Sequence, residues 1–218
     1  MSKKSIILMV VLIATLLCGC STQKHQLKKK IAYKVSTITV KGDFYRTSMG
    51  SGFFILYKKK PFFITATHVV SKKTGVCVFD KESRVIKIDN YTPIHIGASD
   101  ISIYPLRKLP LDVSWYKVRE TSLIKGEPVF SCGYVYQNRQ YKLIRRSGLY
   151  LGEYLMPQHD SMFISTSCKI EHGMSGGPIF DKNNEIVGVV SYGLFNISIE
   201  RSLGSSIETL KAHLGFFF

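Results

Sequence analysis

Gly173-Met174-Ser175-Gly176-Gly177-Pro178 places a serine between glycines in a turn that leads straight into a strand-like run. Glycine tolerates left-handed backbone angles and lets a second backbone approach closely. The N–H groups of Gly173 and Ser175 can then point into one concavity, where a nucleophile and an anion hole would coincide. Taken alone, the stretch is also consistent with a tight glycine-rich turn that contains an incidental serine.

Short β-branched and aromatic runs, separated by turn residues, recur along most of the chain. They are Tyr33–Val40, Ser51–Tyr57, Phe62–Ala66, Gly75–Phe79, Arg84–Ile88, Ile101–Leu106, Pro128–Tyr134, Lys142–Gly152, Met162–Ser167, Pro178–Phe180 and Ile186–Tyr192. This pattern predicts an all-β fold. The Asp-Lys-Asn-Asn sequence at 181–184 tolerates turn angles, so the last two runs are predicted to form a hairpin. So many short strands suit two small barrels or a sandwich better than a parallel α/β fold.

Helical spacing occurs near the end of the chain. Ile207, Leu210 and Leu214 recur at intervals of three and four within Ser205–Leu214. They form one apolar stripe, which predicts a short helix packed on the β-structure.

Two further segments carry candidate chemistry. His68 stands in Thr-Ala-Thr-His-Val-Val, just after a buried-looking strand, and an imidazole can activate a hydroxyl near neutral pH. Asp100 enters an alternating apolar strand, where a carboxylate could orient the imidazole. A lone histidine is more often structural, and a lone aspartate at this place is usually a loop residue or strand cap.

Taken in the order His68, Asp100, Ser175, the three segments resemble trypsin-like serine proteases of the chymotrypsin fold, in particular the compact bacterial kind related to Deg/HtrA and glutamyl-endopeptidase enzymes. The resemblance covers about residues 33–214. Its motifs are Ser51-Gly52-Phe53-Phe54-Ile55, Thr65-Ala66-Thr67-His68, Asp100-Ile101-Ser102-Ile103, Gly173–Pro178 and, behind the nucleophile, Ile186–Gly193.

The resemblance implies an all-β fold of two six-stranded β-barrels, at about 33–112 and 125–203, followed by the short C-terminal helix and an apolar tail at 215–218. It implies a serine endopeptidase that acts on protein or peptide substrates and needs no cofactor. Asp100 would orient His68, and His68 would take the proton from Ser175. The backbone N–H groups of Gly173 and Ser175, with Met174 as a further candidate, would form the oxyanion hole.

The walls of the substrate pocket follow from the same resemblance. They would be formed by Cys168, Lys169 and Ile170 on one side and by Ser191, Tyr192 and Gly193 on the other. Lys169 would line a pocket for acidic side chains if the loop has trypsin-like length, whereas Ile170 would point inward and leave a small apolar pocket if it follows the Deg/HtrA pattern. The second option is favoured, because burying an unpaired lysine is costly. His172 is expected at the rim of the pocket.

The sequence departs from the family pattern at three places. Met174 replaces the aspartate or asparagine that is frequent before the serine, so activation by a newly cut N-terminus is not expected. Ser102 stands where alanine is usual, which is a mild change. No PDZ-like segment follows Leu214.

The N-terminus indicates export. Lys3 and Lys4 precede an apolar run over 6–17 that is short for a membrane span, which is typical of a secretory signal. The following Leu-Cys-Gly-Cys resembles the lipobox of bacterial lipoproteins and predicts cleavage after residue 19 and a lipid on Cys20. Residues 20–32 would be a basic tether, and the protein would be anchored in the cell envelope, in the outer membrane if the cell has one. An uncleaved anchor with incidental cysteines is the alternative.

The net charge and the cysteines limit which partners, metal sites and disulfides are expected. The formal net charge is +15, which brings polyanions into consideration, but the lysines are dispersed and no nucleic-acid-binding motif occurs, so no specific nucleic-acid partner is expected. The scattered histidines and the absence of a Cys-x-x-Cys pair predict no metal site. Cys77, Cys132 and Cys168 allow at most one internal disulfide. A catalytically inactive protease fold that serves as a binding module remains the main rival function.

Overall fold

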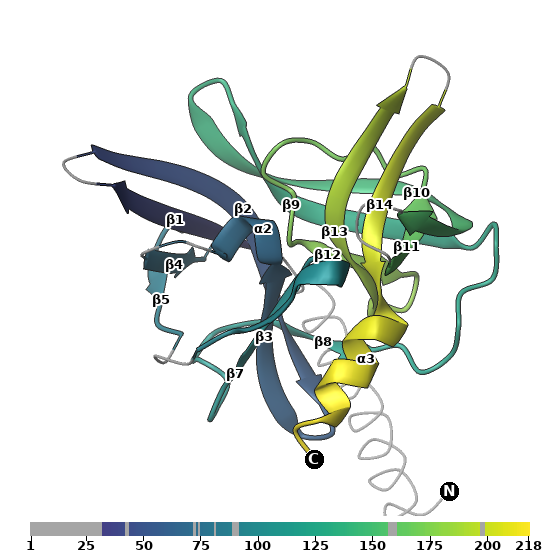
Figure 1. The fold of residues 1–218 in the computed structure, drawn as a ribbon, viewed down its shortest axis with the longest axis horizontal. Helices are drawn as coiled ribbons and strands as arrows, with labels where there is room; N and C mark the ends of the chain where they lie inside the picture. The colour runs from purple at the N-terminus through teal and green to yellow at the C-terminus, as the bar shows by residue number, and fades with distance from the viewer. Residues whose placement is uncertain are drawn as a thin grey trace, which may run out of the picture. The chain divides into compact units, whose positions relative to one another are not determined.

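The strands and helices fall into two lobes, shown by their colours in Figure 1. This computed structural model describes residues 32–41, 44–71, 73, 75–80, 82–88, 92–156, 161–196 and 199–218. The expected signal sequence, the lipid site at Cys20 and the tether up to residue 31 lie outside the described residues. Residues 31–218 form one compact unit.

The described residues of the first lobe form seven antiparallel strands, β1 to β7, in the order β5-β4-β1-β2-β3-β7-β6. The strands are β1 (Tyr33–Lys41), β2 (Phe44–Tyr57), β3 (Lys60–Ala66), β4 (Gly75–Phe79), β5 (Val85–Ile86), β6 (Ile94–Ile96) and β7 (Ile101–Pro105). Among the described residues no pairing joins β5 to β6. Aromatic residues fill the core of this lobe, where the Phe54 ring lies 4.9 Å from those of Tyr33 and Phe63.

The second lobe is a closed ring of six antiparallel strands in the order β9-β10-β11-β14-β13-β12, with β12 returning to β9. The strands are β9 (Pro128–Gln137), β10 (Gln140–Met156), β11 (Ser161–Thr166), β12 (Pro178–Asp181), β13 (Glu185–Asn196) and β14 (Ile199–Ser206). The predicted hairpin is confirmed as β12–β13. Its turn is held by the Asp181 carboxylate, which accepts hydrogen bonds from the N–H groups of Asn183 and Glu185 at 2.8 and 2.9 Å.

The lobes are joined by β8 (Trp115–Val118), which pairs in parallel with β2 and with β13. The hydrophobic cluster at this junction contains Phe53 and Tyr116 together with Phe180 and Val189. Because residues of both lobes share one core, the lobes are held against each other by packing as well as by hydrogen bonds.

The C-terminal helix α3 (Ile207–Gly215) closes the junction. Its predicted stripe, Ile207, Leu210 and Leu214, is buried in the shared cluster. The helix begins after Ser206, whose hydroxyl accepts the Thr209 N–H at 3.3 Å as an N-cap.

The structure confirms the all-β fold class. Three strands that the sequence analysis did not predict are present, β6, β8 and β14, and the first lobe has seven strands where six were expected. The strand β2 also begins earlier, at Phe44 and not at Ser51. A four-residue helix, α2 (Thr67–Val70), was not predicted either. No helix in the described part of the chain is long and apolar enough to span a membrane.

Candidate active site

Asp100 lies at the entrance to β7, directly after a short 3-10 helix, η1 (Gly97–Ser99). Its backbone is left-handed, with φ +52°, an angle that aspartate adopts more readily than most residues. The Asp100 carbonyl accepts the Thr67 N–H at 3.1 Å, which joins this turn to α2. The Asp100 side chain is 3% exposed, so its carboxylate is presented inside the protein and not to solvent.

His68 lies in α2, directly after β3. Its Nδ1 is 2.7 Å from Asp100 Oδ2, and its backbone N–H donates to Asp100 Oδ1 at 2.9 Å. A carboxylate accepts a hydrogen bond from an Nδ1–H group, so this contact favours the tautomer that carries its proton on Nδ1 and leaves Nε2 free to accept one. The His68 side chain is 40% exposed, which leaves the imidazole open on one side while Asp100 is enclosed.

Ser191, in β13, donates a hydrogen bond from its hydroxyl to Asp100 Oδ2. Ser191 is one of the residues expected in the pocket wall, and its side chain lies against the Asp100 carboxylate. The Ser191 carbonyl accepts the hydroxyl of Ser175 at 3.4 Å. One residue of the second lobe therefore contacts both Asp100 and Ser175. No hydrogen bond between Ser175 and His68 occurs within the described residues.

Ser175 follows a tight turn from Glu171 to Met174. The Met174 N–H donates to the Glu171 carbonyl at 3.0 Å, and Gly173 has φ +99°, which is the positive angle required at the third position of a type II turn. The N–H groups of Gly173 and Ser175 donate to no residue that the structure describes. Met174 was expected as a further oxyanion donor, but its N–H is used within the turn and its side chain is fully buried.

Ser51 holds this turn from the first lobe. Its N–H donates to the Ser175 carbonyl at 2.7 Å, its hydroxyl donates to the Gly173 carbonyl at 2.7 Å, and the same hydroxyl accepts the Tyr134 N–H at 2.8 Å. The contact is so close that a Cβ on Gly176 would lie 2.2 Å from the Ser51 carbonyl oxygen. Gly176 also has φ +85°, so only glycine fits this position without strain.

Glu171, the first residue of the turn, is held from the second lobe. Its carboxylate pairs with the Arg146 guanidinium and accepts a hydrogen bond from Gln137 Nε2 at 2.8 Å. The hydrogen bond from Arg146 lowers the pKa of the Glu171 carboxyl below its ordinary value of 4.5. The turn is thus fixed at its first residue by an ion pair and at Gly173 by Ser51.

The residues expected to line the substrate pocket have different environments. Ile170 and Cys168 are buried in the hydrophobic cluster of the second lobe, whereas Lys169 is exposed. The Tyr192 ring stacks on His68 at 5.6 Å, and burial, followed by the nearby Asp100 carboxylate, raises the pKa of its hydroxyl. Gly193 continues β13 opposite Ser202.

The sequence analysis also singled out one further histidine and three cysteines. His172 is exposed and lies within the turn from Glu171 to Met174. All three cysteines are free, so no disulfide joins Cys132 to Cys168. In the part of the chain that the structure describes, no three His, Cys, Asp or Glu side chains gather closely enough to hold a metal ion.

Ser51, Arg146 and Glu171 were not predicted as residues of the site, and Ser191 was predicted without its contact to Asp100. Ser51 and Ser191 stand inside the motifs that were recognised, but nothing local to those motifs indicates the partner of a serine hydroxyl. Arg146 stands in the long strand β10, twenty-five positions from Glu171. These contacts join residues that are far apart in the sequence, so they become visible only in the folded structure.

Comparisons with known proteins concern the family and the fold. The Trypsin-like peptidase domain family matches residues 50–189. The active form of the Rv3671c protease from M. tuberculosis aligns with a TM-score of 0.69 at 17% identity, over 86% of this chain and 80% of that one. Its inactive form aligns with a TM-score of 0.62, also at 17% identity, over 84% of this chain and 87% of that one.

An HtrA-type protease, AlgW with a tripeptide, aligns with a TM-score of 0.65 at 14% identity, over 85% of this chain and 59% of that one. At these identities the likeness concerns the fold alone. No curated protein was found to match the chain. The family match covers more than half of the sequence and includes the segments that carry His68, Asp100 and Ser175, so the chain belongs to the trypsin-like peptidase domain family.

Proposed function

We propose that the protein is a serine endopeptidase that hydrolyses peptide bonds with Ser175 as nucleophile, His68 as general base and Asp100 as the group that orients His68. The observation that carries the proposal is the buried carboxylate of Asp100, which holds both Nδ1 and the backbone N–H of His68. A carboxylate enclosed in this way keeps the imidazole in one tautomer, which is the condition for general-base catalysis by Nε2.

The proposed reaction has two stages. The Ser175 hydroxyl attacks the carbonyl carbon of the peptide while His68 Nε2 takes its proton, and His68 then gives that proton to the leaving amine. The resulting acyl-enzyme is hydrolysed by water, whose proton passes to His68 and then back to Ser175. In the resting structure the hydroxyl of Ser175 lies near the Ser191 carbonyl, so a change of its side-chain rotamer must precede attack.

The oxyanion would be stabilised by the N–H groups of Gly173 and Ser175. Their lack of partners among the described residues supports this role. Loss of one such donor costs roughly 3–4 kcal/mol of transition-state stabilisation in related chemistry. Gly173 has a positive φ of +99°, and its N–H donates to no residue that the structure describes.

The rival function is an inactive protease fold used as a binding module. The observation in its favour is the 3.4 Å contact of Ser175 with the Ser191 carbonyl, which leaves the nucleophile apart from its base. The two functions are separated by a peptidase assay on residues 31–218 beside the Ser175→Ala variant. We expect residues 31–218 with Ser175 intact to cleave an unfolded protein substrate and the Ser175→Ala variant to cleave none. Equal activity of both would contradict the proposed nucleophile, and a folded protein with no activity would favour the binding module.

We further propose a small apolar primary pocket. The burial of Ile170 and the exposure of Lys169 support this choice over a pocket for acidic side chains. Cleavage after Val, Ala or Leu is expected when a peptide library is profiled. Dominant cleavage after Glu would select Lys169 instead, and dominant cleavage after Arg or Lys would contradict both pockets.

For the N-terminus the proposal remains cleavage between Gly19 and Cys20, with lipid on Cys20 and attachment to the cell envelope. The apolar run at 6–17 and the small residue before Cys20 support it. Intact-mass measurement of the protein from a bacterial membrane fraction tests it. A mature chain that retains Met1, or an unmodified Cys20, would contradict it.

A further inference from the structure

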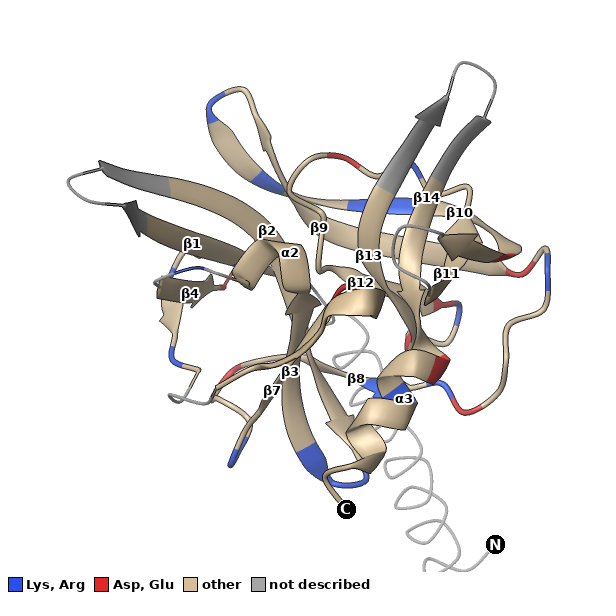
Figure 2. Ribbon diagram, in the orientation of Figure 1, with Lys and Arg blue, Asp and Glu red and all other residues tan. Residues whose placement is uncertain are grey.

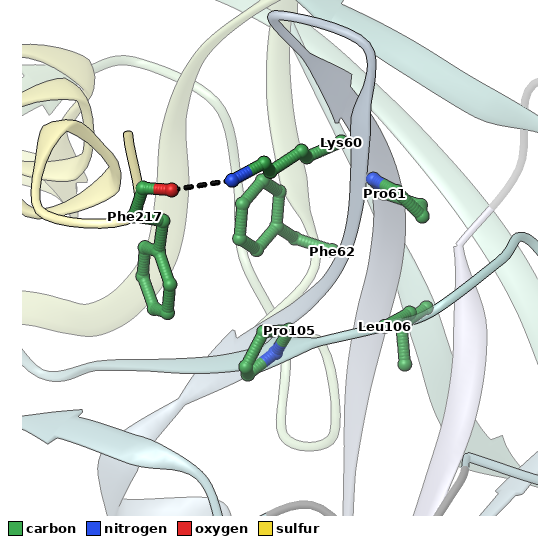
Figure 3. Close-up of a pocket in the computed structure, with 6 residues that line it drawn as sticks. All are labelled: Lys60, Pro61, Phe62, Pro105, Leu106 and Phe217. Atoms are coloured by element: carbon green, nitrogen blue, oxygen red, sulfur yellow. Dashed lines mark hydrogen bonds between the residues drawn. The ribbon is translucent and has the colours of Figure 1, made fainter.

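Three segments of the chain meet at one end of the first lobe. The first is the β2–β3 turn with the start of β3, at 58–62. The second is the end of β7 with the residues that follow it, at 105–108, and the third is the tail after α3, at 216–218. The Leu106 N–H donates to the Pro61 carbonyl at 3.0 Å, and the Lys60 ammonium donates to the Phe217 carbonyl at 2.5 Å. The rings of Phe62 and Phe217 are 5.2 Å apart (Figure 3).

Between these segments lies a pocket of about 220 Å³. Apart from the Lys60 side chain, its lining is apolar: Pro61, Phe62, Pro105, Leu106 and Phe217 (Figure 3). None of these residues belongs to the candidate active site. The pocket is therefore a feature of a separate surface.

The two phenylalanines next to the pocket residue Phe217 in the sequence are exposed. Phe216 is 84% exposed and Phe218 is 53% exposed, although phenylalanine is among the residues most often buried. Phe218 is held in place by the Tyr57 ring at 6.0 Å and by the ammonium groups of Lys58 and Lys60 at 5.2 and 4.5 Å from its centroid. These cation–π contacts keep apolar rings and positive charges together on one surface.

The same surface is strongly basic. Its cations are Lys58, Lys59, Lys60, Arg107 and Lys108, and the stretches 58–62, 105–109 and 215–218 contain no aspartate or glutamate. Figure 2 shows blue in the β2–β3 turn and at the end of β7. We call these five cations together with Phe216 and Phe218 the basic-aromatic face.

We propose that the basic-aromatic face binds the surface of an anionic phospholipid bilayer. Clusters of four or more lysine and arginine residues are attracted to anionic headgroups, because each cation gains free energy near the negative surface. Exposed aromatic rings among such cations can enter the boundary between headgroups and acyl chains. Phe216 and Phe218 supply the apolar contact, and the lysines around them supply the charge. The interaction is independent of peptide hydrolysis and of any lipid on Cys20.

The test uses residues 31–218, which form one compact unit and contain the described hydrophobic clusters. The fraction of the protein that sediments together with vesicles is measured for vesicles of phosphatidylglycerol and phosphatidylcholine in equal amounts, and for vesicles of phosphatidylcholine alone. We expect binding to the mixed vesicles that is at least tenfold stronger than to the neutral ones and that weakens as salt is added.

The decisive variant combines Lys58→Asn, Lys59→Asn and Lys108→Gln. Asparagine suits positions 58 and 59, where φ is +45° and +67°, so the turn is preserved. Removing three cations near the surface should weaken binding to the mixed vesicles about 100-fold, at roughly fivefold per cation. The matched control, Lys125→Gln, Lys142→Gln and Lys182→Gln, removes the same charge from exposed positions of the second lobe and should weaken binding less than threefold.

A second variant, Phe216→Ser with Phe218→Ser, keeps every charge and should weaken binding about tenfold. It checks the aromatic part of the face separately. The proposal is overturned if wild-type protein binds mixed and neutral vesicles equally or binds neither. It is also overturned if the two triple-lysine variants lose binding to the same extent, since the whole-protein charge would then explain the attraction.

Discussion

The two lobes contribute to the site in different ways. In the first lobe His68 and Asp100 are in direct contact at 2.7 Å, and both lie at the ends of short strands that pair with each other. In the second lobe Ser175 lies on a turn whose nearest described partner for the hydroxyl is a carbonyl at 3.4 Å. The proposed base and its orienting carboxylate therefore already contact each other within one lobe, whereas the contact between the proposed nucleophile and that base must form between lobes.

This difference explains why so many hydrogen bonds cross the junction beside the site. Ser51 binds the carbonyls of Gly173 and Ser175, and Ser191 binds Asp100. Each of these bonds joins a residue of one lobe to a residue of the other. If the proposed mechanism is right, changes within the first-lobe pair should abolish activity outright, and changes in the junction should reduce activity by degrees.

The largest effect is expected for the reacting groups themselves. Ser175→Ala and His68→Ala should each lower kcat by about 10⁵–10⁶-fold, because the nucleophile and its base act as a unit. The exposed His172, which has no described carboxylate partner, supplies the control: His172→Ala should keep kcat within about threefold. Steady-state kinetics on one peptide measures all three. Similar losses in His68→Ala and His172→Ala would show that the wrong histidine has been assigned.

A smaller but still large loss is expected for Asp100→Asn. The amide can present a donor to His68 Nδ1, which favours the wrong tautomer and should lower kcat about 10⁴-fold. The variant should fold, since the amide replaces the carboxylate with the same shape. A loss of less than tenfold in a folded protein would mean that Asp100 only supports the turn.

Next in size is Ser51→Ala, which acts on the junction. It would leave the buried Tyr134 N–H and the Gly173 carbonyl without their partner, so the free energy of unfolding should fall by about 1–3 kcal/mol. Because Gly173 would lose its anchor, kcat should fall by about 10–100-fold with little change in KM. Thermal unfolding and steady-state kinetics give the two values.

Ser165→Ala is the matched control for that substitution. Ser165 is equally buried, but its hydroxyl has no hydrogen-bond partner in the structure. Its replacement should leave kcat within about twofold. Equal kcat losses in the two variants would assign the effect of Ser51 to general packing and not to the turn.

The smallest effect is expected for Glu171→Gln, which removes the charge that pairs with Arg146. The pair is partly exposed, so its contribution is about 0.5–1 kcal/mol. The folded-state pKa of Glu171 lies below its ordinary value, so the pair stabilises the protein above about pH 4.5 and is lost as the pH falls through the lowered pKa. Thermal unfolding from pH 3 to 7 should show wild type and variant converging at the acid end. Glu153→Gln, at an exposed position, should show no such convergence, and a gap between wild type and Glu171→Gln that persists at pH 3 would contradict this account.

Much of the fold was predictable because its strands follow an alternating or continuously apolar pattern. β14 was not, since its sequence from Ile199 to Ser206 is rich in serine and glycine. The reason for that composition lies in packing: a Cβ at Gly204 would be 2.2 Å from Ile179 Cδ1. β6 and β8 have three and four residues, which is too short for a pattern to emerge.

The residues of the candidate site also fall into those that a local sequence pattern predicts and those that it does not. His68, Asp100 and Ser175 could be predicted because each stands in a local motif with a recognisable neighbourhood. The sequence offered two alternatives for the pocket, one with Lys169 and one with Ile170 turned inward. It could not decide between them by itself, since the order of residues in a loop does not reveal which side chain is buried. The bonds of Ser51, Ser191 and Arg146 depend on contacts between distant parts of the chain, which no local pattern encodes.

We propose that Ser175 is a nucleophile that His68 activates across the junction of the lobes. Labelling of residues 31–218 with a fluorophosphonate, followed by intact mass and peptide mapping, tests it most directly, because this reagent needs an activated serine but no knowledge of the substrate. We expect one adduct per chain, located on Ser175, and no adduct in His68→Ala or Ser175→Ala under the same conditions. A folded wild-type protein that remains unlabelled, or that is labelled at another residue, would contradict the claim.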